Sequence, residues 1–157
     1  MNSRRNFIQK STVLGAGVAL APSFTYGSFS AGANEKLNVG LIGAGLRGTN
    51  HLGNLLLRKD VNVTAVCDID PARIAIAKDL ISKAGGKVPK TFGSNDHDYR
   101  NLLALAEVDA VVIATPWLWH TRMAVDAMKA GKYAGVEVSA SNTMEECWDL
   151  VNTHEQT

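Results

Sequence analysis

The sequence lacks the features that would place it in several common classes of protein. No apolar run is long enough to span a bilayer comfortably, so no stable membrane span is expected. The net charge is only +1, which gives no reason to expect a nucleic-acid partner. Only two cysteines are present, Cys67 and Cys147. We expect both to fill the core and predict no disulfide between them.

Metal-ligand spacing is also absent. His51, His97 and His154 are too far apart in the sequence to suggest one site, and we expect them on the surface or on helix faces. The run Asp96-His97-Asp98 is predicted to be a solvated turn that contributes a helix cap. No metal site is therefore predicted.

The first 33 residues have the pattern of an export signal. The segment Ser3-Arg4-Arg5-Asn6-Phe7-Ile8 is a twin-arginine pattern, the apolar stretch Val13 to Ala21 follows it, and Ala31-Gly32-Ala33 offers a cleavage site. A basic, disordered start is the alternative. We expect export by the twin-arginine pathway to the periplasm or the medium. That route carries folded proteins, so a cytoplasmic dinucleotide could be bound before export.

A glycine motif follows a short apolar run. After Leu37 to Ile42 come Gly43, Gly45 and Gly48, the spacing G-x-G-x-x-G where a strand would lead into a helix. Gly43 allows a tight turn, Gly45 leaves the backbone open to a pyrophosphate, and Gly48 lets the helix pack closely. The free amides and the dipole of the helix start favour phosphate.

A dinucleotide-binding site also needs an acidic residue at the end of the second strand, and this chain has one there. The apolar run Val61 to Cys67 ends in Asp68, twenty residues after Gly48. An acid there accepts hydrogen bonds from the adenosine ribose, and it favours NAD over NADP because a 2′-phosphate would meet like charge. Arg73 could soften that preference, although a surface helix position is the simpler interpretation. A structural turn with a solvated aspartate is the alternative to a dinucleotide site.

Residues 34–157 alternate between apolar strands and amphipathic helices, which predicts an α/β fold with a doubly wound parallel sheet. The expected strands are 37–42, 61–68, 88–92, 109–114 and 133–138. The expected helices are 46–58, one from Asp70 and Pro71 to Gly85, one from Asn95 or Asp96 to Leu105, one stopped by Gly131, and one from a Thr143–Glu146 capping box to about Asn152.

Four segments carry a resemblance to a known family: GLIGAGLRG, AVCDIDPAR, DYRNLLALAEVDAVVIATPWLWH and AVDAMKAGKYAGVEV. They resemble the N-terminal domain of the glucose–fructose oxidoreductase and inositol dehydrogenase (Gfo/Idh/MocA) superfamily, over residues 36–152. Within it, ATPWLWH and GVEVSASNTMEECWDLV look like glycoside hydrolase family 109, whose members are exported, NAD-dependent α-N-acetylgalactosaminidases.

The resemblance implies an NAD site at the carboxyl edge of the sheet. Leu46 and Arg47 would contact the pyrophosphate, the segment Trp117 to His120 would line the cofactor, and Glu137 with Val138 would lie by the nicotinamide ribose. The cofactor-binding residues so predicted are Gly43, Gly45, Leu46, Arg47, Gly48, Asp68, Trp117, Leu118, Trp119, His120, Glu137 and Val138. For Arg47 and Trp117–His120, the alternative is an ordinary solvated arginine and a packed aromatic loop.

One departure separates the branches of the superfamily. Its typical dehydrogenases have Glu-Lys-Pro, with a catalytic lysine, where this chain has Glu137-Val138-Ser139. Valine cannot exchange a proton, and the glycosidase branch has Glu-Val-Pro, so Val138 agrees with that branch and Ser139 departs from both. The implied mechanism is oxidation at the sugar 3-hydroxyl, elimination of the glycosidic oxygen, addition of water and return of the hydride.

The chain ends at Thr157, where the last expected helix ends. We therefore expect a truncated chain whose second α/β domain, with the family's catalytic tyrosine and histidine, is absent; no catalytic residue is assigned. Its partners would be NAD and, in the full-length enzyme, an amino-sugar glycoside, with a possible homo-oligomer formed through the missing domain. The alternatives are a Gfo/Idh/MocA sugar dehydrogenase and a non-catalytic nucleotide-binding fragment.

Overall fold

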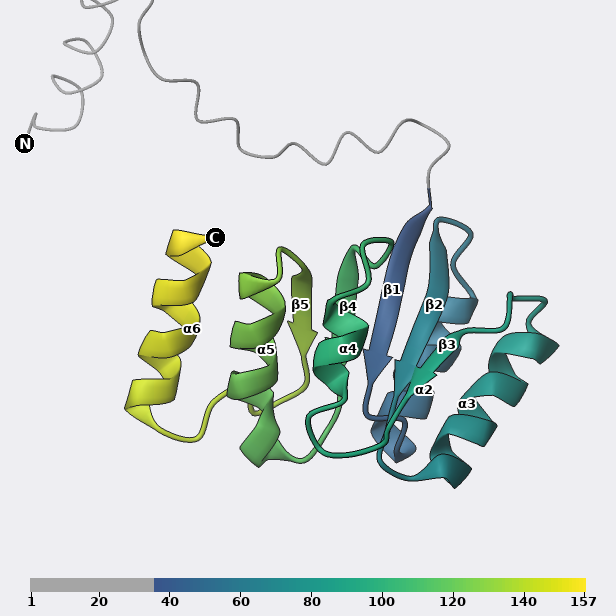
Figure 1. Cartoon of the computed structure of the whole chain (residues 1–157), viewed down its shortest axis with the longest axis horizontal. Coiled ribbons are helices and arrows are strands. Elements are labelled where there is room, and N and C mark those ends of the chain that lie inside the picture. The colour runs from purple at the N-terminus through teal and green to yellow at the C-terminus, as the bar shows by residue number, and fades with distance from the viewer. Residues whose placement is uncertain (1–35) are drawn as a thin grey trace, which may run out of the picture. The chain divides into compact units, whose positions relative to one another are not determined.

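The fold is a five-stranded parallel sheet covered by helices (Figure 1). The computed structural model describes residues 36–157; the predicted export signal lies outside these residues. The strands, in the spatial order β3-β2-β1-β4-β5, are β1 (Leu37–Ile42), β2 (Val61–Cys67), β3 (Lys90–Phe92), β4 (Ala110–Ile113) and β5 (Tyr133–Val136). The helices are α2 (Leu46–Leu56), α3 (Pro71–Lys83), α4 (Tyr99–Leu103), the 3₁₀ turn η1 (Trp117–Trp119), α5 (His120–Lys129) and α6 (Met144–Gln156). The predicted fold class is confirmed.

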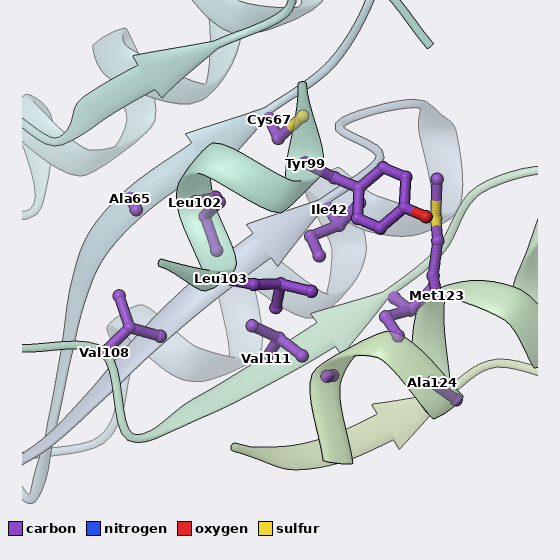
Figure 2. Close-up of a cluster of buried hydrophobic side chains, with 12 residues drawn as sticks. Ile42, Ala65, Cys67, Tyr99, Leu102, Leu103, Val108, Val111, Met123 and Ala124 are labelled. Atoms are coloured by element: carbon purple, nitrogen blue, oxygen red, sulfur yellow. The ribbon is translucent and has the colours of Figure 1, made fainter. Parts of the chain in front are cut away.

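Two apolar cores lie on the two faces of the sheet. On one face, Leu52 of α2 and Ala77 and Ile81 of α3 pack against Leu41 and Val66. The other face carries the cluster in Figure 2, where α4 and α5 cover the sheet with Tyr99, Leu102, Leu103, Met123 and Ala124. Gly40 of β1 makes room for this layer, because a Cβ there would lie 2.7 Å from Leu102 Cδ2. Helix α6 packs on α5 at the side of the sheet (Figure 1).

A bulge in β2 divides its side chains between the two cores. The pairing of β1 with β2 shifts between Val39 and Gly40, and Thr64 is the extra residue of β2. Val63 and Val66 therefore contribute to one core, while Ala65 and Cys67 contribute to the other. A β-bulge has this effect because one added residue reverses the alternation of side chains.

The element boundaries follow the local signals where these are strong. Asp70 Oδ1 accepts the amide of Ala72 at 2.8 Å and Pro71 is the first residue of α3, as predicted. Strand β3 is shorter than predicted and starts after Pro89, which lacks the amide that a strand needs. Helix α6 runs four residues beyond the predicted end at Asn152, because no glycine or proline stops it.

Three predictions from the sequence are wrong. Cys147 is exposed on α6, so only Cys67 fills the core; both cysteines are free thiols. Asp98 lies outside the solvated part of the turn before α4: Asp96 and His97 are exposed as predicted, but Asp98 is buried and its Oδ2 accepts the amides of Gly93 at 2.6 Å and Ser94 at 2.8 Å. Helix α4 starts at Tyr99, without a side-chain cap from Asn95 or Asp96. Within residues 36–157, no helix has the length and apolar character needed to cross a membrane.

Candidate dinucleotide-binding site

The three glycines of the motif form a tight turn between β1 and α2. Gly43 has φ +89°, and a Cβ there would lie 2.8 Å from the backbone of Ala114 at the end of β4. A Cβ on Gly48 would lie 1.9 Å from the carbonyl oxygen of Gly43. Both positions therefore require glycine for the packing of the turn itself.

Gly45 differs from the other two because nothing in the chain lies within 4 Å of where its Cβ would be. Its backbone at the start of α2 faces open space on the side of a pocket. Thr49 is the first residue whose amide donates back to this turn, to Gly45 O at 2.9 Å. In the described part of the chain, the amides of Leu46, Arg47 and Gly48 have no acceptor, as expected of a first helical turn. A phosphate fits this arrangement, since it supplies both the missing acceptors and the negative charge that the helix dipole favours.

Asp68 connects the end of β2 to the glycine turn. Its Oδ2 accepts the amide of Ala44 at 2.6 Å, and its Oδ1 accepts the amide of Asp70 at 2.9 Å. These bonds fix the carboxylate at the wall of the pocket, where each oxygen retains a lone pair. The remaining lone pairs are available to accept further hydrogen bonds, and the predicted contact with a ribose stays a prediction.

A pocket of about 340 Å³ lies at the carboxyl edge of the sheet, where β1 and β4 are neighbours. In this sheet order, the connections from β1 and β4 run to opposite sides, which is the place where doubly wound sheets bind ligands. Four of the predicted residues line the pocket: Gly43, Gly45, Asp68 and Trp119. Cys67 also lines it, and burial raises the pKa of its thiol to about 12.

The residues of the Trp117–His120 segment lie in three different environments. Trp119 lines the pocket. The rings of Trp119 and His97 form a T-shaped pair with their centroids 5.6 Å apart, and the guanidinium carbon of Arg122 lies 5.8 Å from the centroid of the Trp119 ring. Trp117 and Leu118 are 65% and 78% exposed. His120 is buried, and its ring nitrogens lie 2.8 Å from the carbonyl oxygens of Thr115 and Ser139. His120 therefore holds the segments after β4 and β5 together, and its contact with a cofactor stays a prediction.

Glu137 follows β5 and reaches across to α2. Its Oε1 lies 2.6 Å from both Arg47 Nε and His51 Nε2, and its Oε2 accepts the amide of Val138 at 3.0 Å. The hydrogen bond from Arg47, then those from His51 and Val138, lower the pKa of Glu137 to about 2. The carboxylate is thus charged and paired at neutral pH. Val138 and Leu46 are each 77% exposed and lie outside the lining of the pocket.

Sequence reasoning missed several residues of the site. His51 lies on a helix as expected, but its role was not foreseen, although its spacing of four residues from Arg47 places both on one face of α2. The pocket is also lined by Ile69, Asn95, Asp96, Tyr99, Thr115 and Pro116. Asn95, Asp96 and Thr115 follow the ends of strands, a signal that could have indicated them. Within residues 36–157, no cluster of histidine, cysteine or acidic side chains is arranged to hold a metal ion.

A parallel sheet with this order, a glycine turn open at Gly45 and an acid at the end of β2 defines a dinucleotide-binding domain. Comparison with known families makes the class specific. The chain belongs to the GFO_IDH_MocA oxidoreductase family, described by its NAD-binding Rossmann fold, whose model matches residues 37–157. This confirms NAD as the predicted cofactor. The contacts of the individual predicted residues with NAD stay predictions.

Among curated relatives, the chain is similar to glycosyl hydrolase family 109 proteins. It is 41% identical over 161 residues to such a protein of Solibacter usitatus, covering 99% of this chain and 37% of the relative. It is 40% identical over 172 residues to the alpha-N-acetylgalactosaminidase of Tannerella forsythia, again covering 99% of this chain and 37% of the relative. The chain therefore spans little more than a third of the length of these proteins.

Solved structures with the same fold include two inositol dehydrogenases. The myo-inositol 2-dehydrogenase of Lactobacillus plantarum has a TM-score of 0.66 at 23% identity, covering 78% of this chain and 34% of the other. The scyllo-inositol dehydrogenase of Lactobacillus casei, solved with NAD(H) and scyllo-inositol, has a TM-score of 0.67 at 23% identity, covering 78% and 34%. At this identity the likeness concerns the fold alone.

Proposed function

We propose that this chain is the NAD-binding part of an exported glycosidase that acts on α-N-acetylgalactosaminides. The open position at Gly45, beside three amides that have no acceptor within residues 36–157, is the observation that carries the NAD site. The choice of glycosidase is supported by the similarity to the Tannerella forsythia α-N-acetylgalactosaminidase. The activity itself is proposed for a longer protein, since the relatives extend far beyond the matched part.

Each part of the site would have a separate task. The amides of Leu46, Arg47 and Gly48 would bind the pyrophosphate, and Asp68 would orient the adenosine ribose. When bound, NAD would supply reversible hydride acceptance, which the side chains of the protein cannot provide. Val138 can neither donate nor accept a proton, so the proton transfers of the reaction would fall to groups outside this segment.

Substitution of Gly45 tests the NAD site directly. Gly45→Ala adds a methyl group in open space, so no clash arises and the fold should be retained, with about 1 kcal/mol lost because alanine is a poorer N-cap than glycine. The same methyl would stand where the pyrophosphate approaches, and we expect NAD binding to weaken roughly tenfold or more, as a loss of about 1.4 kcal/mol implies. Titration calorimetry of the whole chain measures this. Gly53→Ala, an open site in the same helix, is the control; equal NAD affinity in wild type and Gly45→Ala would refute the site.

The glycosidase and the dehydrogenase hypotheses differ in their products. The coding DNA is read beyond the codon of Thr157, and the encoded protein is assayed with a p-nitrophenyl α-N-acetylgalactosaminide and with free sugars. Release of p-nitrophenol without net NADH is expected for the glycosidase. Net NADH from a free sugar would favour a dehydrogenase, and absence of both activities would leave a nucleotide-binding chain.

Export is proposed from the twin-arginine pattern of residues 3–8. Replacement of Arg4 and Arg5 by lysine keeps the charge of the segment but removes the arginine pair. We expect the wild-type chain in the periplasmic fraction of its host and the double variant in the cytoplasm. Equal distribution of the two proteins between the fractions would contradict export by this pathway.

A further inference from the structure

The sheet order assigns the two ends of a bound dinucleotide to opposite sides of the glycine turn. Asp68 follows β2 on one side of β1, and Glu137 follows β5 on the other. With the pyrophosphate at the start of α2 and the adenosine ribose on Asp68, the other nucleoside lies over β4 and β5. Glu137 is therefore the carboxylate at the strand end on the nicotinamide side of the glycine turn.

His51 and Arg47 both contact this carboxylate, but they restrict its position to different degrees. The Arg47 side chain is 65% exposed and is long and flexible, and exposed ion pairs of this kind are screened by solvent. The His51 side chain is 31% exposed, has only two rotatable bonds and lies one turn further along α2. Because a carboxylate can only accept, the proton of the 2.6 Å contact lies on His51 Nε2.

We propose that His51 is a positioning residue for the nicotinamide half of the site: it fixes the Glu137 carboxylate from α2 at the end of β5. The contact joins residues 86 positions apart and ties the helix that starts at the pyrophosphate to the end of β5. This inference rests on the proposed NAD binding. It assigns to His51 a task that is carried out through Glu137.

The test compares two ligands that share the adenosine diphosphate part. The whole chain and the variants His51→Ala, His51→Gln and His154→Ala are titrated calorimetrically with NAD and with ADP. His154 is an exposed histidine on α6, so its replacement is the matched control. In His51→Ala the loss of a hydrogen bond to a charged group should weaken NAD binding roughly tenfold. ADP binding should be unchanged, and His51→Gln should recover most of the NAD affinity, since its amide can donate to Glu137.

Each outcome decides between the proposals. If the wild-type chain does not bind NAD, the proposed function and this inference both fail. If the wild type binds NAD and His51→Ala binds it equally well, only the inference fails. Equal weakening of NAD and ADP would show a general effect on folding and would also overturn it.

A measurement on the wild-type protein covers the case in which His51→Ala does not fold. The ¹⁵N resonance of His51 Nε2 should move on addition of NAD and stay in place on addition of ADP. The same response to both ligands would contradict a role confined to the nicotinamide half.

Discussion

Gly48 and Gly53 lie on the same helix, but an added Cβ would meet another part of the chain only at Gly48. A methyl group at Gly48 would overlap the Gly43 carbonyl oxygen, whereas at Gly53 it would enter open space. We expect Gly48→Ala to lower the free energy of unfolding by about 1–3 kcal/mol, as overpacking does. Gly53→Ala should raise it by about 0.5–1 kcal/mol, because alanine loses less entropy in a helix. Urea unfolding followed by circular dichroism measures both; equal effects would contradict the close packing of the turn.

Thr64, the bulge residue of β2, contains a buried hydroxyl without a hydrogen-bond partner in the described part of the chain. Valine has the same shape without the polar atom, so Thr64→Val should raise the free energy of unfolding by about 1 kcal/mol. Thr121→Val is the matched control. That hydroxyl donates to Ala140 O at 2.8 Å, so its loss should destabilise the chain. Destabilisation by Thr64→Val in urea unfolding would show that its hydroxyl is bonded in solution.

At the scale of elements, the pair between α2 and the end of β5 predicts a pH dependence. The pKa of Glu137 is about 2 in the folded chain and near its ordinary value of 4.5 in the unfolded chain. A carboxyl group whose pKa is lowered by folding stabilises the fold above its unfolded pKa and loses this effect as the pH falls towards its folded pKa. Glu137→Gln should therefore unfold at a lower temperature than wild type at pH 7.

The difference in unfolding temperature between the two proteins should shrink as the pH falls from 4.5 to 2. Over this range the carboxyl group is protonated first in the unfolded chain and, near pH 2, also in the folded chain. Thermal unfolding at several pH values measures this. The exposed pair Lys83–Asp79 on α3 offers a control, since Asp79→Asn removes a solvent-screened ion pair of the same charge type. A Glu137→Gln difference that persists unchanged at pH 2 would contradict the assigned pairing.

The elements that were predictable are those encoded by neighbouring residues. The start of α3 needs only Asp70 and Pro71, and the turn at Gly43 follows directly from the glycine spacing. The length of β3 and the burial of Asp98 depend instead on which segments pack around them. Local pattern has no information on such packing, so these predictions were wrong or imprecise.

The same division applies to the site. Gly43, Gly45 and Asp68 could be found because the motif places them at fixed spacing, and the structure brings them to one pocket. The contact of His51 with Glu137 depends on how β5 lies beside β4 and how α2 crosses the sheet. No short-range pattern contains that geometry, and the sequence offered only the helical spacing of Arg47 and His51.

At the scale of the whole molecule, cofactor binding should increase the free energy of unfolding. A ligand that binds only the folded chain adds about 2.7 kcal/mol to the free energy of unfolding at one hundred times its Kd. We expect NAD to raise the urea midpoint in this way, and NADP at the same concentration to raise it less, because its 2′-phosphate would meet Asp68. An equal effect of the two dinucleotides would contradict the role of Asp68 in selecting NAD.

The central place of β1 in the sheet has a consequence for biosynthesis. β1 is synthesised before the other strands of the sheet. The amide of Asn38 in β1 nevertheless donates to the side chain of Asp109, which follows 71 residues later. Arg47 in α2 donates to Glu137, which follows 90 residues later. As the nascent chain leaves the ribosome, β1 and β2 can pair early. The entropy of closing the longer loops delays β4 and β5, as in other folds of high contact order. The pocket is therefore completed late, when β4 and the segment after it, which carries Thr115 and Trp119, are in place.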